Sequence, residues 1–205
     1  MTEGNNNQIA KKVISDNPKN NFKPNQFVKT VLEQIDIFVI AFAIIILVTF
    51  FAVRICTVNG DSMRDTLVDN EPIFVENIFY TPKRGDIVVF HQTGPMENDF
   101  NEPIVKRVIG IAGDTVKIEH FKDTMRVTIT DAEGNVTILD ENYIRYDYPS
   151  YPDSTTYVEE GTIFVMGDNR SHSGDSRSNK IGLVDTRRVI GRVFFKLGSD
   201  FGTVD

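Results

Sequence analysis

The residue types of a serine hydrolase gather in one polar segment of the chain, Gly167–Arg177, with the sequence GDNRSHSGDSR. Its side chains could supply the nucleophile, base and acid of a Ser-His-Asp triad, from Asp168, Ser171, His172 and Ser173. All four lie in a single polar loop, without the strand–turn–helix context that exposes such a nucleophile. The sequence therefore disfavours a histidine-based triad, and a hydrophilic surface loop is the simpler interpretation of this segment taken alone.

Three further segments combine glycine with serine, aspartate, lysine or arginine. They are Gly60–Leu67 (GDSMRDTL), Arg84–Phe90 (RGDIVVF) and Val105–Asp114 (VKRVIGIAGD). Each also has a structural interpretation: the second resembles a turn entering a buried strand, and the third ends in a turn where Gly113 supplies a positive φ. No single segment therefore identifies a function.

Together and in this order, the four segments resemble the motifs of the bacterial type I signal peptidases, over nearly all of residues 32–196. The family patterns are Ser-Met-x-Pro-Thr-Leu, Arg-Gly-Asp-Ile-Val, Lys-Arg-Val-x-Gly with Gly-Asp shortly after, and Gly-Asp-Asn-Arg-x-x-Ser-x-Asp-Ser-Arg. Every specified position of the last pattern is matched. The resemblance implies a membrane-bound serine endopeptidase of the short Gram-positive type, which removes signal peptides from exported preproteins after Ala-x-Ala-like sites.

By this resemblance, Ser62 is the nucleophile and Lys106 is the general base. A serine hydroxyl is a weak nucleophile that needs a positioned base, and lysine can serve only when it is neutral. Because the pKa of free lysine is about 10.4, a base that works at about pH 8 must be buried among apolar groups. Lys106 lies in the apolar segment Ile104–Ile109. The sequence alone does not say whether its side chain faces the core, but the resemblance implies that it does.

The resemblance also assigns supporting residues around the dyad. Ser173 matches the position whose hydroxyl helps to orient the base. Asp175 is expected to pair with Arg177 and with Arg107, which holds the site together.

The chain departs from the family patterns near the nucleophile. The oxyanion needs preorganised donors, and the backbone N–H of Ser62 is one. Many relatives add a hydroxyl two residues earlier, where this chain has Gly60, so a second donor is missing or comes from the backbone or water. Asp65 replaces a proline that would fix φ near −65°, which predicts a looser turn unless an Asx-type hydrogen bond compensates. Ala112 replaces a further common proline.

The composition limits the possible partners. The formal net charge of −7 argues against nucleic acid, because phosphate binding needs a basic surface. A single cysteine, Cys56, excludes an intramolecular disulfide and a cysteine-based metal site. The three histidines, His91, His120 and His172, lack the spacing of metal ligands. We therefore expect no cofactor, no metal and no nucleic-acid partner.

The segment Ile37–Val53 contains 17 consecutive uncharged, mostly apolar residues, which indicates a transmembrane helix over residues 32–54. A cleaved signal peptide or a buried core helix fits less well, because the run is long and nearly without polar residues. Residues 1–31 are rich in Asn and Lys, carry a net charge of +3, and are expected to form a disordered cytoplasmic tail. Residues 55–205 are then the extracytoplasmic peptidase domain of a single-pass plasma-membrane protein.

The sequence of residues 55–205 predicts a mainly β domain, with two antiparallel sheets in a barrel-like arrangement. Short runs rich in Val, Ile, Phe and Tyr alternate with Gly, Pro, Asp and Asn, and no helical periodicity is sustained. The expected strands are Ile73–Phe79, Asp86–His91, Val105–Ile111, Thr115–Phe121, Arg126–Thr130, Val136–Leu139, Thr162–Met166 and Val189–Lys196. A hairpin loop is expected over residues 131–135.

Two other functions remain as alternatives. A relative without peptidase activity could assist the assembly of surface proteins or pili; Asp65 favours it, whereas the presence of both Ser62 and Lys106 argues against it. A self-cleaving transcriptional regulator would need a DNA-binding domain and no membrane helix. As a further hypothesis, apolar residues around Met63 and in Phe74–Phe79 dip into the bilayer interface.

Overall fold

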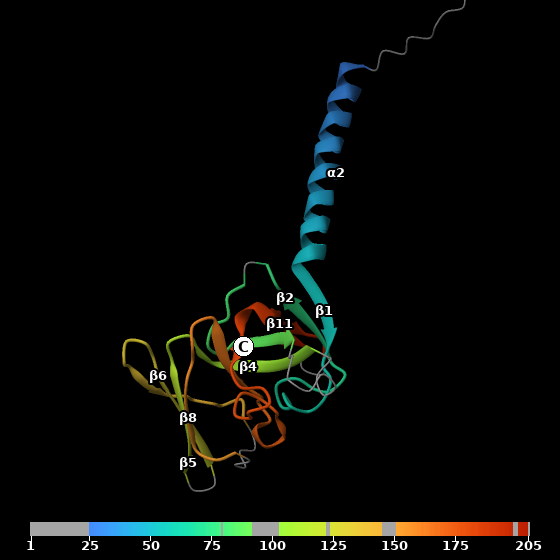
Figure 1. The fold of residues 1–205 in the computed structure, drawn as a ribbon. Coiled ribbons are helices and arrows are strands. Elements are labelled where there is room, and N and C mark those ends of the chain that lie inside the picture. Colours follow the sequence, from blue (N-terminus) through green and yellow to red (C-terminus); the bar gives the residue numbers. More distant parts are fainter. Residues whose placement is uncertain are drawn as a thin grey trace, which may run out of the picture. The chain divides into compact units, whose positions relative to one another are not determined.

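The structure of the chain is a computed structural model that describes residues 25–78, 80–91, 103–121, 124–144, 151–198 and 201–204. Most of the expected N-terminal tail and Phe79 lie outside these residues. The helix up to Leu47 and the chain from Val48 onward form two compact units. Helix α2 (Gln26–Ala52) includes six residues that the sequence assigned to the tail (Figure 1). Its segment Gln26–Val48 is long and apolar enough to cross a membrane.

The larger sheet of the second unit, sheet A, is antiparallel and curls into a half-barrel (Figure 1). Its strands follow the order β1-β2-β11-β3-β4-β9-β10, and β12 pairs with β11. Their bounds are β1 (Val53–Thr57), β2 (Pro72–Glu76), β3 (Ile87–His91), β4 (Pro103–Ile111), β9 (Thr162–Met166), β10 (Val184–Asp185), β11 (Val189–Lys196) and β12 (Gly202–Thr203). Strand β4 lies in the interior of this sheet, between β3 and β9.

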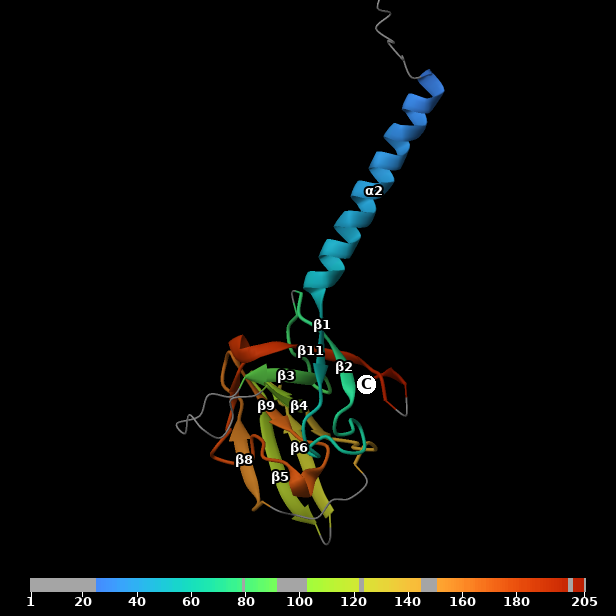
Figure 2. The same ribbon diagram turned by 90° about the vertical axis from the view of Figure 1, so that its right-hand side faces the viewer.

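The smaller sheet, sheet B, contains four antiparallel strands in the order β7-β6-β5-β8 (Figure 2). Their bounds are β5 (Thr115–Phe121), β6 (Thr124–Thr130), β7 (Val136–Ile138) and β8 (Ser154–Tyr157). A short turn after β4 leads directly into β5, so one continuous segment joins the two sheets. Gly110 lies just before that turn, where a Cβ would come within 2.6 Å of Val116 Cγ2. Glycine at this position therefore allows β4 and β5 to approach each other.

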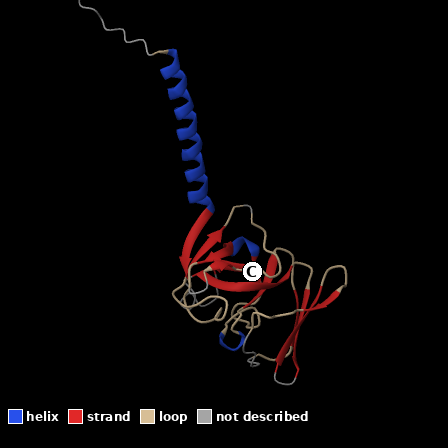
Figure 3. Ribbon diagram, turned by 180° about the vertical axis from the view of Figure 1, so that it is seen from behind, coloured by secondary structure: helices blue, strands red, loops and turns tan. Residues whose placement is uncertain are grey.

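After α2 ends at Ala52, helical structure within the described residues is limited to two short 3-10 turns, η1 (Arg170–His172) and η2 (Thr186–Arg188) (Figure 3). The buried apolar side chains form three clusters. One lies between sheet B and the β4–β9 region, and another contains Met63, Leu67 and Ile73. The second cluster matters for the site, because it holds the turn that follows Ser62.

The predicted fold class is confirmed: the domain is mainly β, with two antiparallel sheets and one preceding apolar helix. All eight expected strands are present, with ends that differ by up to three residues, and the hairpin over residues 131–135 joins β6 to β7. In that loop, Asp131 Oδ1 accepts hydrogen bonds from the backbone N–H groups of Glu133 and Asn135. The sequence missed β1, β8, β10 and β12, which are short or lack a dense run of large apolar residues.

Candidate active site

A tight turn over residues 62–66 carries Ser62 at its start. Met63 is 1% exposed and Leu67 is fully buried, and the N–H of Leu67 donates to the carbonyl of Met63 at 2.8 Å. Two apolar side chains therefore anchor the turn in the core, while Ser62 remains partly accessible. The hypothesis that Met63 contacts lipid is wrong, because its side chain packs inside the domain.

Lys106 lies in β4, opposite Val88 of β3, and is only 3% exposed. Its Nζ lies 2.7 Å from Ser62 Oγ and donates to the carbonyl of Val105 at 2.8 Å. The side chain therefore faces the interior, a point that the sequence alone left open. Burial lowers the pKa of Lys106 from its ordinary value to about 8, although the carboxylates of Asp175 and Asp168 oppose this change.

The expected pair of Asp175 and Arg177 is present next to the dyad. Arg177 Nε donates to Asp175 Oδ1 and its second terminal nitrogen to Oδ2, both at 2.8 Å. The backbone N–H of Gly167 also donates to Asp175 Oδ2 at 3.0 Å. Both side chains are almost completely buried, so the pair is a fixed part of the interior.

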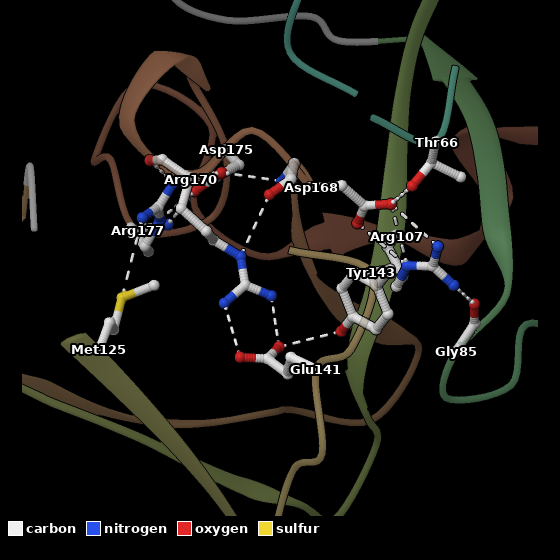
Figure 4. Close-up of polar contacts among 11 residues, drawn as sticks. Thr66, Gly85, Arg107, Met125, Glu141, Tyr143, Asp168, Arg170, Asp175 and Arg177 are labelled. Atoms are coloured by element: carbon white, nitrogen blue, oxygen red, sulfur yellow. Dashed lines mark hydrogen bonds and ion pairs between the residues drawn. The ribbon is translucent and has the colours of Figure 1, made fainter. Parts of the chain in front are cut away.

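Arg107 pairs with Asp168 rather than with Asp175 (Figure 4). Its Nε and a terminal nitrogen donate to the Asp168 carboxylate at 3.0 and 2.9 Å, and the other terminal nitrogen donates to the Gly85 carbonyl at 2.9 Å. Asp168 Oδ2 accepts a further hydrogen bond of 2.5 Å from the hydroxyl of Thr66. This carboxylate therefore connects the strand that carries Lys106 to the turn that carries Ser62.

Ser173 lies close to the nucleophile turn but does not bond to Lys106. It is 5% exposed, and its Oγ has no hydrogen-bond partner among the described residues. A Cβ at Gly167 would overlap both Ser173 Oγ and the carbonyl oxygen of Ser62. Gly167 therefore leaves the space in which these two groups approach each other.

Gly60 adopts a φ of +92°, and its backbone N–H donates to Asp69 Oδ1 at 2.7 Å. That N–H is already engaged, and glycine has no side-chain donor. The backbone N–H of Ser62 thus remains the candidate oxyanion donor at this position.

The histidine-based alternative has no geometric support. His172 Nδ1 lies 2.9 Å from Ser171 Oγ, in an exposed contact. The carboxylate of Asp168, however, is occupied by Arg107 and Thr66. The described contacts therefore contain no Ser-His-Asp chain.

The sequence analysis missed a brace behind the site, formed by Glu141, Tyr143 and Arg170 (Figure 4). Glu141 accepts two hydrogen bonds from the fully buried guanidinium of Arg170, one of them at 2.8 Å. The Tyr143 hydroxyl donates to Glu141 at 2.9 Å, and the Tyr143 ring lies 4.1 Å from the guanidinium carbon of Arg107. Only Arg170 belongs to a recognised motif, so no local pattern marks the other two residues.

Comparison with known proteins shows the family to which the chain belongs. A family model described as signal peptidase, peptidase S26, matches residues 31–197. The chain belongs to this family. The family and the enzyme class expected from the motifs, a signal peptidase of the serine-protease type, are thereby confirmed, and membership supports the removal of signal peptides.

Individual relatives agree with the family match. Signal peptidase IB of Staphylococcus aureus (strain COL) is 33% identical over 188 residues, which cover 82% of this chain and 90% of the relative. A probable signal peptidase I-1 of Synechocystis sp. is 31% identical over 179 residues, covering 84% of each chain. A crystal structure of a signal peptidase I from Enterococcus faecalis V583 shares 28% identity, covering 55% of this chain and 97% of that one, with a TM-score of 0.38.

Proposed function

We propose that the chain removes signal peptides from exported preproteins by means of a Ser62–Lys106 dyad. The observation that carries the proposal is the 2.7 Å contact between Lys106 Nζ and Ser62 Oγ, formed by a lysine that is almost completely buried. A buried lysine whose pKa is about 8 is neutral in a useful fraction of molecules near that pH. Its lone pair can then accept the hydroxyl proton of Ser62.

In the proposed reaction, Ser62 Oγ attacks the carbonyl carbon of the scissile peptide while its proton moves to Lys106 Nζ. The Ser62 N–H stabilises the oxyanion that forms. Collapse of the tetrahedral intermediate breaks the C–N bond, and Lys106 returns the proton to the departing amine of the mature protein. Water then gives a proton to Lys106 as it attacks the ester carbonyl. The C–O bond to Ser62 breaks, Lys106 returns that proton to Ser62 Oγ, and the signal peptide leaves as a carboxylate whose own proton passes to solvent.

The supporting residues have positioning roles in this proposal. Asp175 with Arg177 fixes the loop after β9, and Asp168 with Arg107 joins that loop to the strand that carries Lys106. Ser173 is buried within reach of the turn and would assist the base once substrate or water enters, in the role that the family motif implies.

The substrate would bind as an extended peptide beside the segments that flank Ser62 and Lys106, where backbone hydrogen bonds fix its register. Small pockets would then accept the Ala-x-Ala-like residues that the family resemblance implies.

The proposed topology is single-pass in the plasma membrane, with residues 1–31 in the cytoplasm and the β domain outside. Nine residue steps separate Val53 from Ser62, so the nucleophile lies within about 30 Å of the end of the anchor. A tethered enzyme then meets a tethered substrate at high effective concentration.

The lipid bilayer also has a candidate contact surface on sheet A. Ile55, Phe74 and Phe195 are directly paired across β1, β2 and β11, so their side chains share one face. Phe201 packs edge-on against Phe195. The side chains of Phe201 and Ile55 are largely exposed, at 70% and 68%. This row begins three residues after helix α2 ends, which supports lipid as its partner. The row takes the place of Met63 in the hypothesis that apolar residues of the domain dip into the bilayer interface.

The proposal is tested by incubating the full chain, solubilised in detergent, with a secretory precursor from pH 6 to 10. Ser62→Ala and Lys106→Ala should abolish cleavage, whereas His172→Ala should retain it. The wild-type rate should rise with pH through the pKa of Lys106. A wild-type chain that binds several precursors without cutting any would instead favour the non-catalytic assembly role.

A further inference from the structure

The turn that carries Ser62 is held from the side of β11 by a lysine outside the recognised motifs. Lys196, the last residue of β11, donates from Nζ to the backbone carbonyl of Thr66 at 2.9 Å. The backbone of Lys196 is itself fixed, because it pairs with Ile73 of β2 on one side and with Gly202 of β12 on the other. A charged donor on a rigid strand therefore bonds to the turn four residues after Ser62.

The backbone of this turn is in a conformation that needs support. Asp65 has a φ of +85°, in the left-handed region that is strained for a residue with a side chain. Such a conformation persists only where surrounding contacts determine it. The residue next to Asp65 is Thr66, and two of its three polar groups are bonded to distant parts of the chain: its hydroxyl to Asp168 and its carbonyl to Lys196.

Open space borders the side of the turn that faces Lys196. A cavity of about 240 Å³ lies there, and Asp65, Tyr143, Lys196 and Thr203 are among the residues that line it. On the opposite side, Met63 and Leu67 pack into the core. Because open space borders the side of the turn near Lys196, a directed hydrogen bond carries more of the restraint there.

We propose that Lys196 is a positioning residue, which fixes the Ser62 hydroxyl at the distance from Lys106 that proton transfer requires. The inference rests on the proposed dyad. Lys196 acts through the backbone of the turn and touches neither substrate nor the reacting atoms. Small displacements of a reacting group lower the rate strongly, since a shift of about 1 Å can cost roughly a hundredfold.

The test compares Lys196→Met, which keeps length and removes the donor, with Lys196→Arg, which keeps a charged donor. Lys117→Met is the matched control, because Lys117 is an exposed strand lysine paired with Glu119. Each full-length protein is assayed for kcat and KM on a secretory precursor, and for amide hydrogen exchange in residues 62–67. In Lys196→Met, we expect kcat to fall about tenfold or more, KM to stay within about twofold, and exchange in the turn to accelerate. Lys196→Arg should recover most of kcat, and Lys117→Met should match wild type.

The proposal is overturned if Lys196→Met keeps the wild-type kcat and turn protection, or if it loses kcat with unchanged exchange in the turn. Should Lys196→Met fail to fold, Lys196→Gln is measured in the same way, and the same outcomes decide. A wild-type chain that does not cleave would defeat the proposed dyad function, whereas the exchange measurement would still report whether Lys196 holds the turn. The two proposals therefore fail on different readouts.

Discussion

Replacing Lys106 with methionine tests whether this side chain is a buried cation at neutral pH. Methionine has a similar length and is apolar, so Lys106→Met removes the charge and leaves most of the volume filled. It also removes the hydrogen bonds to Ser62 Oγ and to the Val105 carbonyl at every pH. The informative quantity is therefore the pH dependence of the difference in stability between the two proteins.

The size of the effect follows from the pKa of Lys106, which burial lowers from 10.5 to about 8. Below pH 8, lysine is protonated in both the folded and the unfolded chain, and the folded state bears the whole cost of the buried charge. At 1.36 kcal/mol per pKa unit that cost is about 3 kcal/mol. Between pH 8 and 10.5 the unfolded chain binds more protons, so the stability of the wild type rises with pH. From pH 7 to pH 10, Lys106 alone should add about 2–3 kcal/mol.

The assay is denaturant unfolding of both full-length proteins in the same detergent at pH 7, 8, 9 and 10. Other titrating groups are shared, so they cancel in the difference between the two free energies of unfolding. We expect that difference to move by about 2–3 kcal/mol in favour of the wild type as the pH rises. Parallel stability curves for wild type and Lys106→Met would refute the buried, low-pKa lysine and, with it, the physical basis of the base.

Substitutions at three further positions have defined outcomes. Asp65→Gly should preserve or raise the unfolding midpoint because φ is +85°, whereas Asp65→Pro should lower stability by more than about 1 kcal/mol, since the ring requires a negative φ. Glu141→Leu should cost about 3–5 kcal/mol in denaturant unfolding, because it leaves the buried Arg170 guanidinium without its carboxylate. Gly167→Ala should lower kcat and cost about 1–3 kcal/mol, because the new methyl group displaces the Ser62 carbonyl.

The predictions for Glu141 and Gly167 each have a control in the chain. Glu119→Leu removes an exposed ion pair, which should change stability by less than about 1 kcal/mol. Gly174→Ala places a methyl group where nothing lies within 4 Å, so it should leave kcat unchanged. If a control and its partner behaved alike, the proposed contact would not be the cause. An Asp65→Pro protein as stable as wild type would contradict the left-handed turn.

The sequence predicted the parts of the fold that local patterns encode. Strands such as Thr115–Phe121 and Thr162–Met166 are dense runs of β-branched and aromatic residues between turn residues, and both appear with the expected bounds. The missed strands are different: Val184–Asp185 is two residues long, and Ser154–Tyr157 contains no large aliphatic residue. Such strands form because a neighbouring strand offers free backbone groups, which is information from elsewhere in the chain.

In the candidate site, too, the sequence predicted what motifs encode and missed what depends on distant contacts. Motif order was sufficient to select Ser62 and Lys106, and the structure brings their side chains into contact. The brace was not predictable, because Glu141 meets Arg170 across 29 residues of sequence and lies in no motif. The positive φ of Asp65 was also missed, since a single aspartate in a polar turn is compatible with several backbone conformations.

Ion pairing explains how the lysine of the proposed dyad can lose its proton beside carboxylates that attract it. Two of the carboxylates raise the pKa of Lys106, and burial must outweigh them. Each carboxylate of the buried network has a guanidinium partner, in the pairs Asp168–Arg107, Asp175–Arg177 and Glu141–Arg170. Pairing reduces the net field of the carboxylates at Nζ, so desolvation determines the direction of the pKa change. In the proposed dyad, Arg107 and Arg177 therefore act electrostatically as well as mechanically, because they pair with the two carboxylates that raise the pKa of Lys106. Neutralising either arginine should raise the pH at which Lys106 becomes an effective base.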